Sequence, residues 1–193
     1  DGPREIYRVQ DEIGRGAMGM VVEAVREVER APHRPQPVAL KVSFTTHPTQ
    51  EESLENEAFL AGLAPEHKQL VGRVHAAGHG RCRGRRVFFL AMERLWPDPL
   101  TFLRTHNVLR DSEGIDLKNA VDIYLQLLKS LVEMHRLGIV HGDIKPENIM
   151  LRLPPFARNR GNEVDHYIRS LCLGQYFPVL IDWGCAWDLN AGE

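Results

Sequence analysis

The hydrophobic pattern of the sequence changes once, near residues 95–99, and this change limits the possible folds more than any other feature. Upstream, short apolar runs with a period of two are separated by glycine and proline, which predicts β-strands. Downstream, apolar residues recur every three or four positions, which predicts helices. A chain of 193 residues, 43% of them hydrophobic, is long enough for two small lobes. We therefore predict an α+β, bilobal fold, with an antiparallel β lobe containing one helix at 1–95 and a mainly helical lobe at 96–193.

The first lobe is predicted to contain strands, one helix and glycine-rich turns. The strands are predicted at 6–13, 20–28, 38–44, 71–77 and 85–92. Met20, Val22, Ala24 and Val28 would share one face of the second strand. The helix is predicted at 51–63, and the turns at 14–19 and 78–84.

The second lobe is predicted to contain helices at 100–105 and 117–137 and a hairpin of 150–153 with 179–181. The longer helix has an apolar face formed by Val121, Tyr124, Leu125, Leu128, Leu131, Val132 and His135. Residues 154–178 form an insertion in the hairpin, which we predict to be largely solvated with a short helix around 164–172.

Composition excludes several classes of protein. A net charge of -2 provides no general attraction to nucleic acid or to an anionic membrane, and no apolar run is long enough to span a bilayer. The arginines of 81–86 are not interleaved with aromatic residues and are predicted to form a solvated turn. Three cysteines without a CxxC pair favour reduced thiols and a cytoplasmic location. We expect no nucleic-acid partner and no membrane segment.

The octapeptide 141–148, His-Gly-Asp-Ile-Lys-Pro-Glu-Asn, has the composition and spacing of a phosphoryl-transfer loop. Asp143 can accept the proton of an attacking hydroxyl, and Lys145 can hold the moving phosphoryl group. Asn148 can ligate Mg²⁺ through its amide oxygen. Asp182, at the end of an apolar strand and before Trp183-Gly184, can supply a second oxygen ligand to the metal.

A glycine-rich segment in the first lobe can approach a phosphate closely. Gly14, Gly16 and Gly19, followed by Val21, form a GxGxxGxV pattern, in which backbone amides face the anion without obstruction by side chains. The residues after the glycines are rich in β-branched side chains and lead into prolines, so the loop is predicted between two antiparallel strands rather than before a helix.

Lys41 lies in the apolar strand Val-Ala-Leu-Lys and needs a negative partner if it is buried. Glu57 on the following helix is the favoured partner, because the apolar residues after it, Phe59, Leu60 and Leu63, can pack that face inward. Glu52 and Glu55 remain alternatives, since one sequence does not define the helical register. The pair would direct Lys41 toward the α- and β-phosphates of a nucleotide.

In order and spacing, these four motifs resemble the eukaryotic-type protein kinase family across residues 6–184. Lys145, two residues after Asp143, is similar to Ser/Thr-directed members. The resemblance implies a kinase that uses ATP and Mg²⁺ to phosphorylate Ser/Thr hydroxyls of protein substrates, with an unknown regulatory partner. It also implies a gatekeeper, two hinge residues and three residues that enclose adenine: Met92; Glu93 and Leu95; and Val21, Ala39 and Met150.

The sequence departs from the family pattern at two points. Gly142 replaces the usual arginine, so the chain lacks the cation that normally receives an activation-loop phosphate. The sequence also stops nine residues after Gly184, before the usual Ala-Pro-Glu, which suggests a fragment or a shortened relative. Two alternatives therefore remain open: a nucleotide-binding pseudokinase or scaffold, and a small-molecule phosphotransferase resembling aminoglycoside and choline kinases.

Overall fold

A computed structural model describes seven stretches of the chain, which form two compact units. The described residues are 5–16, 19–29, 35–43, 48–63, 71–107, 116–155 and 162–190. Unit 1 is Asp1–Lys68 with Gly72–Arg94, and unit 2 is Gln69–Val71 with Leu95–Glu193. Within the described residues, no helix combines the length and the apolar character needed to cross a membrane.

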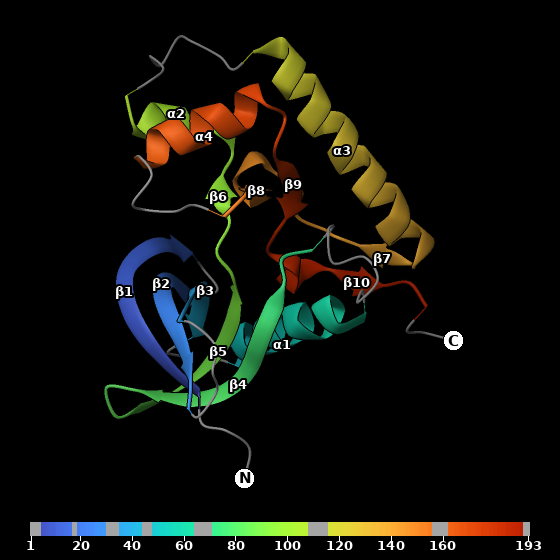
Figure 1. The fold of residues 1–193 in the computed structure, drawn as a ribbon. Helices are drawn as coiled ribbons and strands as arrows, with labels where there is room; N and C mark the ends of the chain where they lie inside the picture. The colour runs from blue at the N-terminus through green and yellow to red at the C-terminus, as the bar shows by residue number, and fades with distance from the viewer. Residues whose placement is uncertain are drawn as a thin grey trace. The chain divides into compact units, whose positions relative to one another are not determined.

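The described residues of unit 1 form a five-stranded antiparallel sheet with one helix, α1 (Pro48–Leu63) (Figure 1). The strand order is β1-β2-β3-β5-β4. The strands are β1 (Glu5–Gly16), β2 (Gly19–Val28), β3 (Gln36–Ser43), β4 (Val74–Cys82) and β5 (Arg85–Glu93). Every neighbouring pair is antiparallel, as expected of strands joined by short connections or by one helix.

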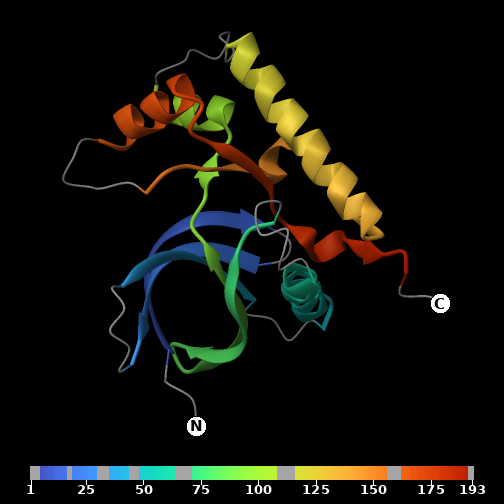
Figure 2. The same ribbon diagram turned by 45° about the vertical axis from the view of Figure 1, so that its right-hand side comes forward.

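The two faces of this sheet have separate apolar clusters, because successive side chains of a strand point in opposite directions. One cluster contains Val22, Ala24 and Leu40, with Met20 packed against it, as the period-two pattern predicted. The other contains Ala39, and the α1 residue Leu54 packs there. Helix α1 therefore covers the face to which Lys41 also belongs, and both views of the ribbon show α1 against the sheet (Figure 2).

Three predictions about unit 1 require correction. The turn predicted at 14–19 is shorter, because strand pairing continues to Gly16 opposite Gly19. The hairpin turn predicted at 78–84 contains only Arg83 and Gly84, because β4 and β5 remain paired up to Cys82 and Arg85. Phe59 is 60% exposed, so it does not pack the inner face of α1 as predicted.

Among its described residues, unit 2 has three longer helices and several short strands. The helices are α2 (Pro99–Thr105), α3 (Leu117–Arg136) and α4 (Glu163–Cys172). The strands form two small sheets, in the orders β10-β7 and β6-β8-β9. Their bounds are β6 (Trp96–Pro97), β7 (Ile139–Val140), β8 (Ile149–Arg152), β9 (Phe177–Leu180) and β10 (Trp187–Asp188). The predicted hairpin corresponds to β8 and β9, which pair antiparallel.

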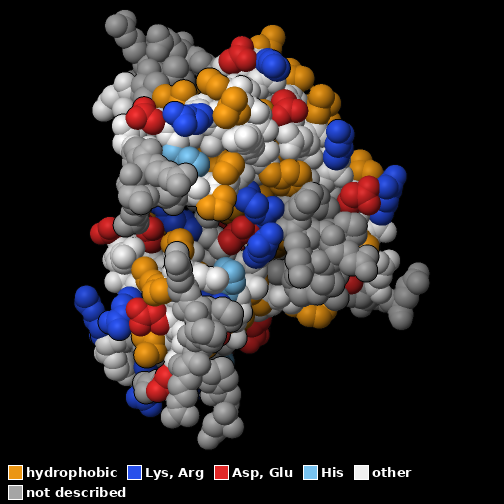
Figure 3. Space-filling model, viewed as in Figure 1, with side chains coloured by type: hydrophobic (Ala, Val, Ile, Leu, Met, Phe, Trp, Pro, Cys, Tyr) orange, Lys and Arg blue, Asp and Glu red, His pale blue; other side chains and the backbone are white. Residues whose placement is uncertain are grey.

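Helix α3 is apolar on two sides, and the side identified by periodicity is not the buried one. Its buried residues are Ile123, Leu127, Ser130 and Met134. Six members of the predicted face are exposed instead: Val121, Tyr124, Leu125, Leu128, Val132 and His135. Figure 3 shows hydrophobic side chains at the surface along the edge that α3 occupies in Figure 1. Periodicity therefore located the helix but not the side that faces the core of unit 2.

The predicted short helix is present in the insertion as α4, but it is packed rather than solvated. Tyr167 of α4 has no exposed surface, and its ring stacks on Phe102 of α2 with centroids 3.8 Å apart. Its hydroxyl donates to the carbonyl of Pro97 over 2.7 Å. Figure 1 shows α2 and α4 side by side. The insertion thus contributes a helix to the core of unit 2.

Replacing Tyr167 with phenylalanine is expected to lower the free energy of unfolding by about 1 kcal/mol, because the Pro97 carbonyl loses its buried donor. Burial raises the pKa of Tyr167, so this hydroxyl stays protonated and can donate throughout the usual pH range. Chemical denaturation measures the change. Tyr124→Phe on the exposed side of α3 is the matched control, and equal effects of the two variants would contradict the packing of α4.

Candidate active site

The loop between β7 and β8 brings the three polar residues predicted for phosphoryl transfer into direct contact. Lys145 Nζ lies 2.6 Å from Asp143 Oδ2. Asn148 Nδ2 donates to the Asp143 carbonyl over 2.8 Å and to Asp143 Oδ2 over 3.1 Å. Residues Pro146–Asn148 form a single turn of 3-10 helix, in which the Asn148 N–H donates to the Lys145 carbonyl. This turn brings Asn148 back toward Asp143. Asp143, Lys145 and Asn148 therefore form one hydrogen-bonded cluster.

The contacts within this cluster favour its charged form. The hydrogen bond from Lys145 holds the pKa of Asp143 below its ordinary value, and the bond from Asn148 acts in the same direction. The same contact with Asp143 raises the pKa of Lys145. At neutral pH the cluster thus presents a carboxylate and an ammonium group side by side.

His141 anchors this loop, a role that the sequence analysis did not assign. Its side chain is buried, and its Nδ1 accepts a bond from the Asp143 N–H over 3.3 Å. Because Nδ1 accepts, Nε2 carries the proton and donates to the Ile181 carbonyl over 3.0 Å. His141 therefore connects the backbone of Asp143 to the segment that precedes Asp182. Its position two residues before Asp143 was the available signal in the sequence.

Asp182 follows β9 in a left-handed conformation, with φ 66° and ψ 58°. The N–H of Ile181 donates to the backbone carbonyl of Asn148 over 2.9 Å. The residue before Asp182 is therefore bonded to a member of the cluster of Asp143, Lys145 and Asn148. Trp183 is buried, lies 4.4 Å from the His141 ring between centroids, and donates through Nε1 to the Leu180 carbonyl. Strained non-glycine backbone persists where the surroundings hold it, and it often occurs at functional sites.

Gly142 also has a left-handed backbone, and it lies close to Cys185. Its φ is 79°, and an added Cβ atom would come within 2.7 Å of the Cys185 carbonyl oxygen. Glycine adopts such backbone angles without steric cost, whereas other residues are strained there. The backbone angle and the nearby Cys185 carbonyl therefore favour glycine at position 142 over the arginine of the family pattern.

Gly142→Arg is expected to lower the free energy of unfolding by about 2 kcal/mol or more, through strain at positive φ together with displacement of Cys185. Gly174→Arg is the matched control, because Gly174 has φ 63° and nothing within 4 Å of its added Cβ. Thermal unfolding of both variants separates the clash from the backbone strain. Equal losses of stability would show that contact with Cys185 is unimportant.

In unit 1, Lys41 pairs with Glu57 rather than with the two alternative glutamates. Lys41 Nζ lies 2.7 Å from Glu57 Oε2, and the side chains are 12% and 5% exposed. Glu52 and Glu55 are exposed on α1. The buried neighbours that orient this side of α1 are Leu54 and Leu60. Screening by solvent is weak at such a pair, so each charge depends on the other.

Three residues that the resemblance assigned to adenine or to the gatekeeper lie in one cluster of unit 1. Ala39 and Met92 are buried there, and Val21 packs against them. The N–H of the expected hinge residue Glu93 donates to the Arg73 carbonyl over 2.8 Å, so this donor is already used. The other two assigned residues belong to unit 2, where Leu95 is buried and Met150 lies in β8.

The glycines of the GxGxxG pattern lie where β1 and β2 meet. Gly14 is opposite Val21, and Gly16 is opposite Gly19. At Gly19, φ is 123°, and an added Cβ would come within 2.5 Å of the Val42 carbonyl oxygen. Glycine is therefore required at Gly19 by the approach of β3, whatever the pattern binds.

A five-stranded sheet with a buried lysine–glutamate pair, and a helical unit with an Asp-Lys-Asn cluster, together define a protein-kinase-like fold. The protein kinase domain family matches residues 7–192. The chain belongs to the eukaryotic-type Ser/Thr protein kinase family.

Similar proteins occur in bacteria, plants and yeast. Serine/threonine-protein kinase PknA of Mycobacterium tuberculosis is 32% identical over 146 residues, which cover 75% of this chain and 32% of PknA. Serine/threonine-protein kinase AFC3 of Arabidopsis thaliana is 27% identical over 192 residues, which cover 92% of this chain and 42% of AFC3. Serine/threonine-protein kinase STE20 of Debaryomyces hansenii is 29% identical over 151 residues, which cover 78% of this chain and 12% of STE20. The chain thus spans less than half the length of these relatives.

Proposed function

We propose that this chain is the nucleotide-binding and catalytic part of a kinase that transfers the γ-phosphoryl group of ATP to Ser/Thr hydroxyls of proteins. The observation that carries the proposal is the cluster in which Asp143, Lys145 and Asn148 contact one another. Such transfer depends mainly on positioning and on neutralising charge, and a carboxylate beside an ammonium group supplies both.

Asp143 would orient the acceptor hydroxyl and take its proton. Its Oδ2 accepts from Lys145 and Asn148, so Oδ1 is the atom proposed to receive the proton. Because its pKa is depressed, Asp143 is ionised throughout the neutral range and loses its charge only in strong acid. Lys145 would stabilise the negative charge of the transferred phosphoryl group. His141 would keep the Asp143 backbone in place through the bond to Nδ1.

Asn148 and Asp182 are proposed to hold Mg²⁺, which neutralises phosphate charge when bound. The Asn148 side chain fits this role, because its nitrogen donates to Asp143 and its oxygen therefore remains for a ligand. Mg²⁺ in such sites is held by one or two protein carboxyl or carbonyl oxygens together with phosphate oxygens and water. The bond from the Ile181 N–H to the Asn148 backbone carbonyl joins the residue before Asp182 to Asn148, which supports a shared metal site.

Lys41 is proposed to bind the α- and β-phosphates, oriented by Glu57, while Gly14, Gly16 and Gly19 allow backbone amides to approach the nucleotide. In unit 1, Val21, Ala39 and Met92 are proposed to contact adenine, with a hinge contact from Glu93, and in unit 2 Leu95 and Met150 are proposed to contribute a hinge and an adenine contact. We also propose a cytoplasmic location, where ATP is available and where the free thiols Cys82, Cys172 and Cys185 stay reduced.

The proposal is tested by incubating the whole protein with labelled ATP and Mg²⁺ together with casein, and in parallel with kanamycin or choline. We expect label in casein at Ser/Thr residues. Thermal stabilisation by Mg-ATP without any transfer would instead identify a nucleotide-binding pseudokinase. Label only in kanamycin or choline would identify a small-molecule phosphotransferase.

A further inference from the structure

The β4–β5 hairpin carries a concentration of positive charge that the proposed catalysis does not use. Arg81, Arg83, Arg85 and Arg86 are all exposed, and no Asp or Glu occurs anywhere from residue 71 to residue 92. The net charge of the whole chain is -2, so this basic hairpin is a local exception. Such a patch attracts anions over short distances at physiological salt.

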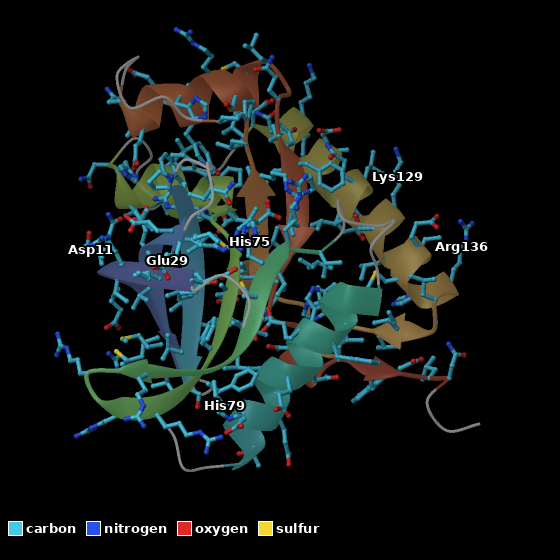
Figure 4. All side chains as sticks on the ribbon, turned by 60° about the horizontal axis from the view of Figure 1, so that its bottom comes forward. Asp11, Glu29, His75, His79, Lys129 and Arg136 are labelled. Atoms are coloured by element: carbon cyan, nitrogen blue, oxygen red, sulfur yellow. The ribbon has the colours of Figure 1, made fainter. Side chains whose placement is uncertain are left out.

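Five other arginines of the described residues form ion pairs with glutamates, whereas these four do not. Those pairs are Arg8–Glu27, Arg15–Glu12, Arg26–Glu5, Arg94–Glu23 and Arg136–Glu133. Within the described part of the chain, the hairpin arginines have no carboxylate partner. Glu51 of α1 contacts this hairpin, but it pairs with His79 over 2.6 Å, and Figure 4 shows His79 beside α1.

The strand register places two of these arginines directly opposite each other. Arg81 of β4 is the partner of Arg86 of β5, and the hairpin closes one pair further on, between Cys82 and Arg85. Directly opposed residues have Cβ atoms about 5 Å apart, and like charges there destabilise the sheet. Arg83 adds a second cost, because it occupies the turn with φ 47°, where glycine or asparagine is favoured. Neither feature helps the hairpin to fold.

We propose that Arg81 and Arg86 form a receptor for the phosphate group of a phosphorylated serine or threonine in a protein segment. Two arginines whose Cβ atoms are about 5 Å apart can both reach one phosphate monoester, which has nearly two negative charges and three acceptor oxygens. A single carboxylate is satisfied by one arginine fork and does not need two. A phosphate bound between Arg81 and Arg86 would attract both guanidinium groups, and this attraction would offset their mutual repulsion.

The composition of the hairpin favours a phosphorylated protein over a membrane or a nucleic acid. Its tip, residues 81–86, has no large apolar side chain to enter a bilayer. The same residues include no aromatic ring on which bases could stack. The remainder of the chain is net negative, which opposes adsorption to an anionic surface.

The test measures binding of a fluorescein-labelled glycine-alanine peptide with one phosphoserine to the whole protein by fluorescence anisotropy. We expect binding of this peptide and not of its unphosphorylated form. R81Q/R86Q is expected to weaken binding at least about tenfold, since each charge-assisted contact is worth that much. R83Q/R85Q, which removes the same charge from the same hairpin without breaking the opposed pair, is expected to change affinity by about threefold or less.

Further measurements test whether a loss of binding comes from misfolding, and whether a membrane or a nucleic acid binds better than the phosphopeptide. Thermal unfolding of R81Q/R86Q should occur no lower than that of the unmodified protein, because a like-charge pair has been removed. Asp143→Asn should bind the phosphopeptide unchanged, so failure of the kinase assignment is distinguishable from failure of this proposal. Equal loss of affinity in both double variants would overturn it. Tighter binding to phosphatidylserine vesicles or to oligouridine would overturn it as well.

Discussion

Asp143→Asn is expected to lower the rate of phosphoryl transfer by about 10²–10⁴-fold, the usual contribution of a positioned general base. Asparagine preserves the size of the side chain but cannot accept the proton of the acceptor hydroxyl. It also removes the charge that Lys145 contacts over 2.6 Å. Because Asp143 is not proposed to bind ATP, kcat should fall while the KM for ATP changes little. Steady-state kinetics with labelled ATP measure both constants.

The control for this variant is Asp116→Asn, which makes the same chemical change in the same unit. Asp116 is exposed before α3, and its side chain makes no capping hydrogen bond. Its rate should match that of the unmodified protein. If Asp143→Asn transferred phosphate at the original rate, the role proposed for the cluster of Asp143, Lys145 and Asn148 would be wrong.

Glu57→Gln is expected to lower the free energy of unfolding by about 3 kcal/mol, because it leaves a largely buried ammonium group without its charged partner. It should also raise the KM for ATP, since Lys41 would no longer be held for the phosphates. Chemical denaturation and steady-state kinetics measure the two effects. Glu52→Gln and Glu55→Gln on the exposed part of the same helix should change neither quantity appreciably.

A double variant separates the two roles of this pair. Lys41→Met in the Glu57→Gln background removes the uncompensated charge, so it should restore most of the lost stability without restoring ATP binding. If the double variant were no more stable than Glu57→Gln alone, burial of Lys41 would not explain the loss. If it bound ATP normally, the nucleotide-binding role of Lys41 would be contradicted.

Much of the local structure could be predicted, because it depends on short-range patterns. Alternation with period two located the strands of unit 1, and spacing of three or four located α2 and α3, whereas α4 was expected from the length of the insertion. Their ends were less predictable. The turns at 14–19 and 78–84 were overestimated because glycine permits a turn without requiring one, and cross-strand pairing extended β1, β2 and β4 into them.

Packing choices between distant segments were not predictable. Helix α3 has apolar residues on both sides, and its side with Ile123, Leu127 and Met134 is the buried one in a unit where α3 packs against β7 and β9. The insertion was predicted to be solvated because its sequence is irregular, whereas stacking of Tyr167 on Phe102 buries its helix. In each case the information lies in a partner that is remote in the chain.

The class of protein follows from the sequence alone, because the spacing within 141–148, the glycine pattern and Lys41 are local properties of the chain. Tertiary structure decided which of three glutamates meets Lys41, and it assigned His141 the task of holding Asp143 to the segment before Asp182. It also placed Arg81 opposite Arg86. The physical reason is that a hydrogen bond or ion pair requires two groups within about 3 Å, and only the folded backbone brings residues 16 or 40 positions apart to that distance.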